Sequence, residues 1–99
     1  MKTVGAGGIV PAKIVQVKWV HLLCRVRVEP IEQSVTVDIR IKVNDASSSK
    51  AQPKNLNDKG EASLAVADDS LAGTSAVVVL LDAEGNVIAK QATTIGGEV

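Results

Sequence analysis

The 99-residue chain contains no Phe, no Tyr and a single Trp, so it has almost no aromatic side chains with which to build a binding surface. Proteins that bind single-stranded nucleic acid stack bases on aromatic rings, and sugar-binding sites commonly use exposed rings as well. The formal net charge is zero, which gives no overall attraction for a polyanion. These absences argue against nucleic acid and carbohydrate as partners.

Cysteine and histidine are equally scarce, with one of each in the whole chain. A lone Cys24 cannot form an intramolecular disulfide, so the fold must be held by packing alone. Structural zinc usually needs four converging ligands, and a catalytic site needs a nucleophile, a base and an orienting group. We therefore expect neither a metal nor a cofactor, and we predict that the protein is not an enzyme. No stretch reaches the roughly 18 apolar residues of a membrane-spanning helix.

Valine is abundant instead, with sixteen copies. Its branched side chain loses freedom in a helix and packs well on a pleated surface, so a Val-rich core predicts β-sheet. Alternating or continuous apolar runs typical of strands occupy residues 13–28, 34–43, 61–67, 75–81 and 87–95. Within 13–28 the alternation changes phase, which predicts a bulge or a break into two strands near Val20 to Leu22.

Residues 34–43 carry the clearest pattern, with apolar side chains at every second position from Val35 to Val43. We expect this strand to pair antiparallel with the preceding one, with Val28 opposite Val35. That register would set Arg25 against Asp38 on a solvent-facing surface, as a favourable cross-strand pair. The run at 75–81 is apolar throughout, which predicts a central strand covered on both faces.

Turn chemistry separates these strands. Gly60 and Gly85 close polar turns at 57–60 and 82–86, and Asp68 or Asp69 is expected to cap one helical turn in 68–73. The polar segment 44–60 suits a connection that crosses from one sheet to another. We predict one domain over residues 13–99 with a flexible arm at 1–12. The fold class is all-β, an immunoglobulin-like two-sheet sandwich of about six or seven antiparallel strands.

Two surface regions are candidate sites. The first is a basic interaction surface on one outer face, to which we assign Arg25, Arg27, Arg40 and Lys42. The second is a candidate binding loop within the 44–60 segment, to which we assign Asn44, Asp45, Lys50 and Lys54. The charge is also divided along the chain, because residues 1–54 carry nine cations and four anions while residues 55–99 carry two and seven. Asp82, Glu84 and Asn86 offer oxygen ligands, yet a turn accounts for them without calcium.

The run Asn57-Asp-Lys-Gly-Glu-Ala-Ser-Leu-Ala-Val66, followed by Leu71-Ala-Gly-Thr-Ser-Ala-Val-Val-Val79, resembles part of the immunoglobulin-like repeats of bacterial surface adhesins. It covers about a quarter of the chain, and the resemblance implies a sandwich that serves as a spacer or binding module. From the residues themselves we expect a non-enzymatic structural or protein-interaction module, which works either as one part of a larger assembly or by self-association through strand edges or oppositely charged faces. An adhesin-type module and a small-ligand binder using the 44–60 segment are the alternatives.

Overall fold

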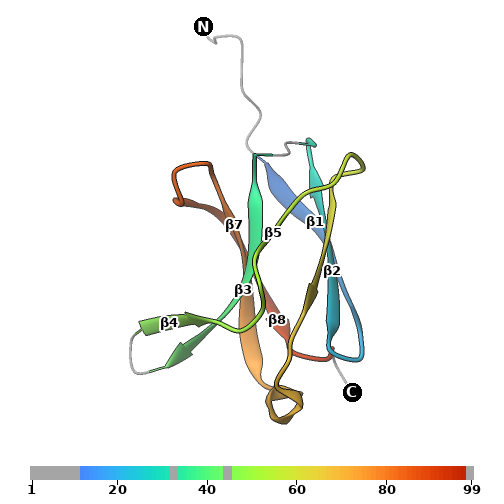
Figure 1. Cartoon of the computed structure of the whole chain (residues 1–99), viewed down its shortest axis with the longest axis vertical. Helices are drawn as coiled ribbons and strands as arrows, with labels where there is room; N and C mark the ends of the chain where they lie inside the picture. Colours follow the sequence, from blue (N-terminus) through green and yellow to red (C-terminus); the bar gives the residue numbers. More distant parts are fainter. Residues whose placement is uncertain (1–11, 32–33, 44–45, 98–99) are drawn as a thin grey trace, which may run out of the picture.

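Eight strands and one helical turn make up the computed structural model, which describes residues 12–31, 34–43 and 46–97, without the side chains of Lys42, Val43, Ala46 and Ser47. The strands are β1 (Lys13–Val20), β2 (Leu23–Glu29), β3 (Thr36–Val43), β4 (Ala46–Ser49), β5 (Lys54–Asn55), β6 (Glu61–Ala65), β7 (Ser75–Leu81) and β8 (Val87–Thr94). They form two antiparallel sheets packed face to face (Figure 1), the predicted β-sandwich. The count exceeds the predicted one because β4 and β5 are short strands within the polar 44–60 segment.

The first sheet has the order β1-β2-β6. The predicted change of phase is a break into two strands, because His21 and Leu22 form a two-residue turn and β1 folds back on β2. His21 takes a positive φ of 52° at this turn. A second irregularity, which we did not predict, shifts the register of β1 between Ile14 and Gln16. The extra residue there is Val15, which is therefore exposed although it has the same parity along the strand as the partly buried Val17 and Trp19.

The second sheet has the order β4-β3-β7-β8, with β5 also paired to β3. As predicted, β7 is a central strand, flanked by β3 and β8. The predicted pairing of β3 with β2 is wrong. The chain crosses to the opposite sheet between these strands, as consecutive strands of sandwiches often do. Asp38 therefore lies opposite Val79, and Arg25 lies opposite Lys18 and Ser63.

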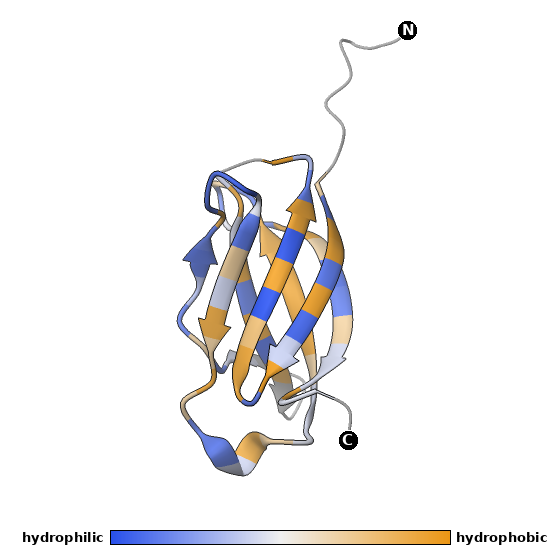
Figure 2. Ribbon diagram, turned by 90° about the vertical axis from the view of Figure 1, so that its right-hand side faces the viewer, coloured by the Kyte–Doolittle hydropathy of each residue, from blue (hydrophilic) through white to orange (hydrophobic). Residues whose placement is uncertain are grey.

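The core lies between the sheets and follows the alternation of the strands (Figure 2). Its fully buried members come mainly from β2, β3, β6 and β7, and include Cys24, Val26, Ile39, Leu64 and Leu80. Trp19 is only partly buried, at one side of this core. Its indole N–H donates a 2.8 Å hydrogen bond to the Thr93 hydroxyl and so links β1 to β8.

The two sides of the sandwich are closed differently. On one side the 44–60 segment passes from the second sheet to the first, as predicted, and Ala51 forms an isolated bridge with Val66 at the end of β6. Leu56 from this segment is buried in the core. On the other side, the turn at Gly96 and Gly97 lies against the end of β1, where a Cβ on Gly97 would be 3.2 Å from the Cβ of Trp19, and no described segment crosses between the rest of β1 and β8. Among the described residues the sandwich is therefore covered along one side and, away from the 96–97 turn, open along the other.

The predicted turns are present. Gly60 and Gly85 have positive φ values of 76° and 85°, and Asp68 caps a 3₁₀ turn, η1 (Asp69–Leu71). Of the predicted arm, residues 1–11 lie outside the described residues, while Ala12 packs against the core. Among the described residues no helix has the length and apolar character needed to cross a membrane.

Candidate protein-interaction site

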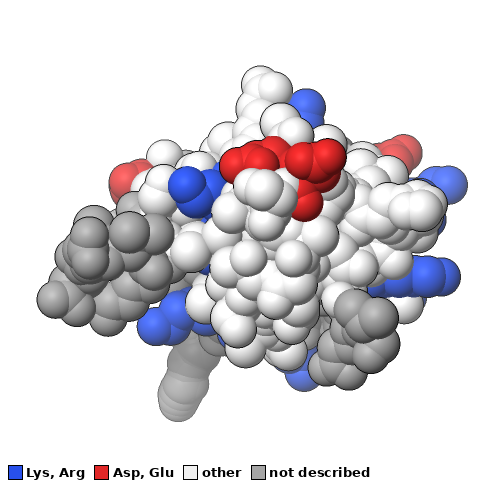
Figure 3. All heavy atoms as spheres, turned by 90° about the horizontal axis from the view of Figure 1, so that it is seen from below, with Lys and Arg blue, Asp and Glu red and all other residues white. Residues whose placement is uncertain are grey.

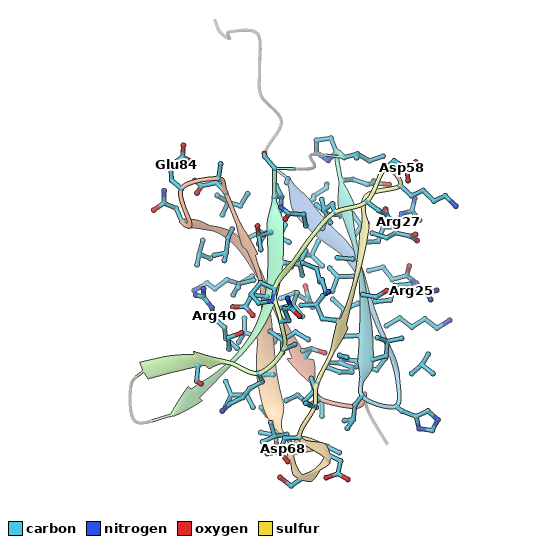
Figure 4. The ribbon with its side chains drawn as sticks, viewed as in Figure 1. Arg25, Arg27, Arg40, Asp58, Asp68 and Glu84 are labelled. Carbon is cyan, nitrogen blue, oxygen red and sulfur yellow. The ribbon has the colours of Figure 1, made fainter. Side chains whose placement is uncertain are left out.

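The four residues predicted to share one basic face are divided between the two sheets. Arg25 and Arg27 lie on β2, whereas Arg40 lies on β3 (Figure 4). Lys42 also belongs to β3. The prediction of a single face fails because it assumed that β2 and β3 pair. The side chain of Lys42 is outside the described part of the structure.

Arg40 is engaged in a local network instead of facing solvent freely. Its Nε donates to the Asp38 carboxylate at 3.0 Å, and the same carboxylate accepts from the Ile39 N–H at 2.8 Å and the Ser49 hydroxyl at 2.6 Å. Asp38 is 2% exposed, although the alternation predicted a wet position. The carboxylate accepts the Ile39 N–H on the side of β3 at a position where neither β4 nor β5 pairs with it. The cluster therefore has a structural role.

The outer face of the first sheet is basic at its centre. Lys18 and Arg25 are directly opposite each other on β1 and β2, and neither forms an ion pair within the described residues. Arg27 pairs with Glu29 at 3.2 Å, between side chains that are about half exposed. Opposed like charges are mildly destabilising in a sheet. The face is a solvated surface with a small excess of positive charge.

The acidic residues of the second half of the chain do not form a matching face. Asp58, Asp68 and Glu84 lie in three separate turns at different corners of the molecule (Figure 4). One acidic patch is visible at the end that carries η1, with basic side chains around its margin (Figure 3). Because the anions are dispersed among turns, the geometry gives little support to assembly through oppositely charged faces.

The predicted binding loop is only partly described. Asn44 and Asp45 lie outside the described residues. Lys50 donates its backbone N–H to the Ile39 carbonyl at 2.9 Å, and Lys54 belongs to β5, which pairs with β3. The described part of this segment is therefore tied to the sheet by backbone hydrogen bonds.

The remaining chemical groups are accounted for by local structure. His21 is exposed at its turn while Cys24 is fully buried, and burial raises the pKa of the Cys24 thiol to about 12. The Asp82 carboxylate accepts the Asn86 backbone N–H at 2.8 Å and the Glu84 N–H at 3.0 Å, which holds its pKa below the ordinary 3.8. Among the described residues, no three His, Cys, Asp or Glu side chains gather as metal ligands.

The open side of the sandwich holds a groove of about 790 Å³ between β1 and β8. Its walls come from Ile14–Trp19 on β1, from Gln91–Thr94 on β8, and from Ser75, Ala76, Gly96 and Gly97. Gln91 points to the inner side of its sheet, because its partner Val78 is in the core, yet it remains exposed to this groove. An edge of each sheet therefore flanks one groove.

The two edges differ in how they are protected against pairing with another strand. Proteins protect exposed edges with charges, bulges, prolines or covering segments. β1 has the bulge at Val15 and the cations Lys13 and Lys18. β8 has one charged residue, Lys90, and a register shift at Ile88, but its register with β7 is regular from Ala89 to Thr94, where the Gly97 N–H caps the Thr94 carbonyl. The 44–60 segment passes beside β6, and β4 and β5 are short, so β8 is the least protected long edge that the structure describes.

The sequence predicted β8 as a strand but not as an edge. Position in a sheet depends on strand order, and the alternation within residues 87–95 is the same for an edge strand as for an inner one. A partial signal was present, because the segment is less apolar than 75–81. A scan against protein-family models finds none that matches the chain, and a search of curated proteins finds no relative. The resemblance to adhesin repeats thus remains an expectation.

Proposed function

We propose that this domain is a protein-interaction module that adds an extended strand of its partner to the free edge of β8. The observation that carries the proposal is that the edge of β8, which is regular over residues 89–94, lies beside an open groove. Strand addition satisfies the free backbone groups of the edge, and the adjacent groove accepts the partner side chains that point inward. The dispersed acidic residues make the strand edge a better route than charged faces.

A fluorescent peptide with the sequence of residues 87–95 is a suitable strand probe, because it has the regularity and low charge of β8 itself. We expect saturable binding to the intact domain, measured by fluorescence anisotropy. Ala92→Pro should weaken binding by about tenfold or more, because proline removes a backbone donor worth about 1 kcal/mol or more and its ring obstructs pairing.

Ala83→Pro is the matched control. Ala83 is exposed, and it occupies the second position of the 82–86 turn, where proline is well tolerated. This variant should bind the peptide like the wild type. Both variants must unfold at temperatures near that of the wild type for the comparison to count. Peptide binding that survives Ala92→Pro, or an absence of both peptide binding and self-association in the wild type, would overturn the proposal.

A further inference from the structure

The backbone groups that β8 presents at its free edge follow from hydrogen bonds at the end of the strand. The Ile95 N–H donates to the Thr74 carbonyl at 2.9 Å, so the backbone groups of Ile95 face the β7 side. Backbone direction alternates along a strand, and the register from Ala89 to Thr94 is unbroken. The N–H and C=O groups of Lys90, Ala92 and Thr94 therefore point away from β7, and of these the Thr94 carbonyl already accepts the Gly97 N–H at 2.8 Å.

A second hydrogen bond supports this assignment from the opposite end of the sheet. By the same alternation, the backbone groups of the odd-numbered β7 residues face β3. Among them, Val77 pairs with Arg40 and Val79 pairs with Asp38. Ile39 must then face the outer side of β3. Its carbonyl does so, since it accepts the Lys50 N–H at 2.9 Å.

The edge-facing residues of β8 are symmetrically spaced about Ala92. In an antiparallel pair, residues whose groups face each other exchange both backbone hydrogen bonds. If two copies of β8 meet with Ala92 opposite Ala92, Lys90 of each copy faces Thr94 of the other. The edge-facing groups of Lys90 and Ala92 and the Thr94 N–H are then paired, and the Thr94 carbonyl accepts a second hydrogen bond beside the one from the Gly97 N–H. A two-fold interface of this kind needs one patch that is complementary to itself, and β8 meets that condition.

Side chains favour the same register. Lys90 is the one charged residue of β8, and this arrangement places it opposite a threonine. Alignment on Lys90 would oppose two like charges, which is unfavourable. If Gln91 lay opposite Gln91 at the two-fold axis, Thr94 would face Ile88, the position at which the β7–β8 register shifts. With Ala92 at the centre, the two alanines meet on the outer face, and Gln91 faces Thr93 on the inner face.

We infer that the partner strand is β8 of a second copy, paired antiparallel about Ala92 so that the two larger sheets become one continuous sheet in a two-fold dimer. This inference rests on the proposed function, of which it specifies the partner. The order across the joined sheet is β4-β3-β7-β8, followed by the same strands of the second copy in reverse.

Disulfide trapping tests the register directly. We expect Ala92→Cys to form a covalent dimer when oxidised with diamide, because the two substituted positions face each other across the two-fold axis. Ala65→Cys is the matched control, since Ala65 is an exposed strand alanine in the opposite sheet, and it should cross-link at least about tenfold more slowly. The native Cys24 is buried, so the wild type should give no cross-linked dimer. Equal rates for the two variants would overturn the inference.

Sedimentation velocity of the wild type, Ala92→Lys and Ala65→Lys at about 100 μM tests the dimer itself. We expect a dimer for the wild type and Ala65→Lys. Ala92→Lys should be monomeric with an unchanged melting temperature, because it opposes two cations at the axis while its side chain remains exposed in the monomer. A dimer that survives Ala92→Lys would show that another surface associates, and would overturn the inference.

The peptide titration separates failure of the inference from failure of the function. A wild type that is monomeric yet binds the 87–95 peptide at β8 would overturn the second copy as partner and leave strand addition to a different protein in place. A wild type that is monomeric and does not bind the peptide would overturn both.

Discussion

Replacing Asp38 by alanine should strongly destabilise the domain, although the alternation of its strand places residue 38 on the solvent-facing side. The carboxylate accepts hydrogen bonds from the Ile39 N–H, the Arg40 Nε and the Ser49 hydroxyl, and it is almost completely buried. Loss of the acceptor leaves the buried Ile39 N–H unsatisfied, at a cost of about 1–3 kcal/mol.

The other two partners contribute less. Arg40 has 29% of its side chain exposed and is partly rehydrated when its partner is removed, which limits its contribution to about 1 kcal/mol. The Ser49 hydroxyl also lies 2.8 Å from the Ala51 carbonyl, so it retains a hydrogen-bond acceptor. Together these effects predict a loss of about 3 kcal/mol, a large share of the roughly 5–15 kcal/mol of a typical domain.

Urea unfolding followed by circular dichroism measures this loss, and a domain of this length should show a fall in melting temperature of about 12–24 °C. Asp38→Asn retains one oxygen for the Ile39 N–H but turns its amide donor toward Arg40, so its cost should be intermediate. Ser49→Ala should cost about 1 kcal/mol or less. A loss below about 1 kcal/mol for Asp38→Ala, or equal losses for alanine and asparagine, would refute the reasoning.

Three further predictions concern single positions. Gly60→Ala should lower the free energy of unfolding in urea by about 2–3 kcal/mol, because a Cβ at this positive φ would lie 2.7 Å from the Val28 carbonyl oxygen. Gly85 also has a positive φ but open space around it, so Gly85→Ala should lower it by about 1 kcal/mol. The Cys24 thiol, with its pKa raised by burial to about 12 from 9.0, should react with iodoacetamide at pH 8 about 10³-fold more slowly in the native protein than in urea, and comparable rates would contradict its burial. Hydrogen bonds from the turn lower the pKa of Asp82 in the folded protein. The contribution of this carboxylate to folding stability is therefore complete above the ordinary pKa of 3.8, and it is lost as the pH falls through the lower pKa of the folded state. The melting temperature of Asp82→Asn should accordingly fall less steeply than that of the wild type between pH 5 and pH 2.

Strand positions were predictable because alternation is a local property. Residues 75–81 were predicted as a strand and form β7 without a change of bounds, and the break near Val20 to Leu22 followed from a change of phase that no single strand accommodates. The turns at Gly60 and Gly85 were predictable for the same reason, since few residues other than glycine adopt a positive φ at low cost.

Pairing was not predictable in the same way. The pattern of β3 shows which residues face inward, and it fits a neighbour in either sheet equally well. The expected Arg25–Asp38 pair failed for this reason, and so did the shared basic face, since both depended on β2 and β3 being adjacent. The burial of Asp38 was missed because it depends on Ser49, which the intervening segment brings to β3.

The amino-acid sequence by itself determined that this is a β-protein held by a valine-rich core without a disulfide, and it determined where most of the strands and turns lie. These features depend on neighbours along the chain, through side-chain branching, two-residue alternation and turn chemistry. Only the tertiary structure decided that β8 is an exposed edge beside an open groove, and that Lys90, Ala92 and Thr94 present their backbone groups there. Strand order arises from contacts between segments far apart in the sequence, and the candidate site is a consequence of that order.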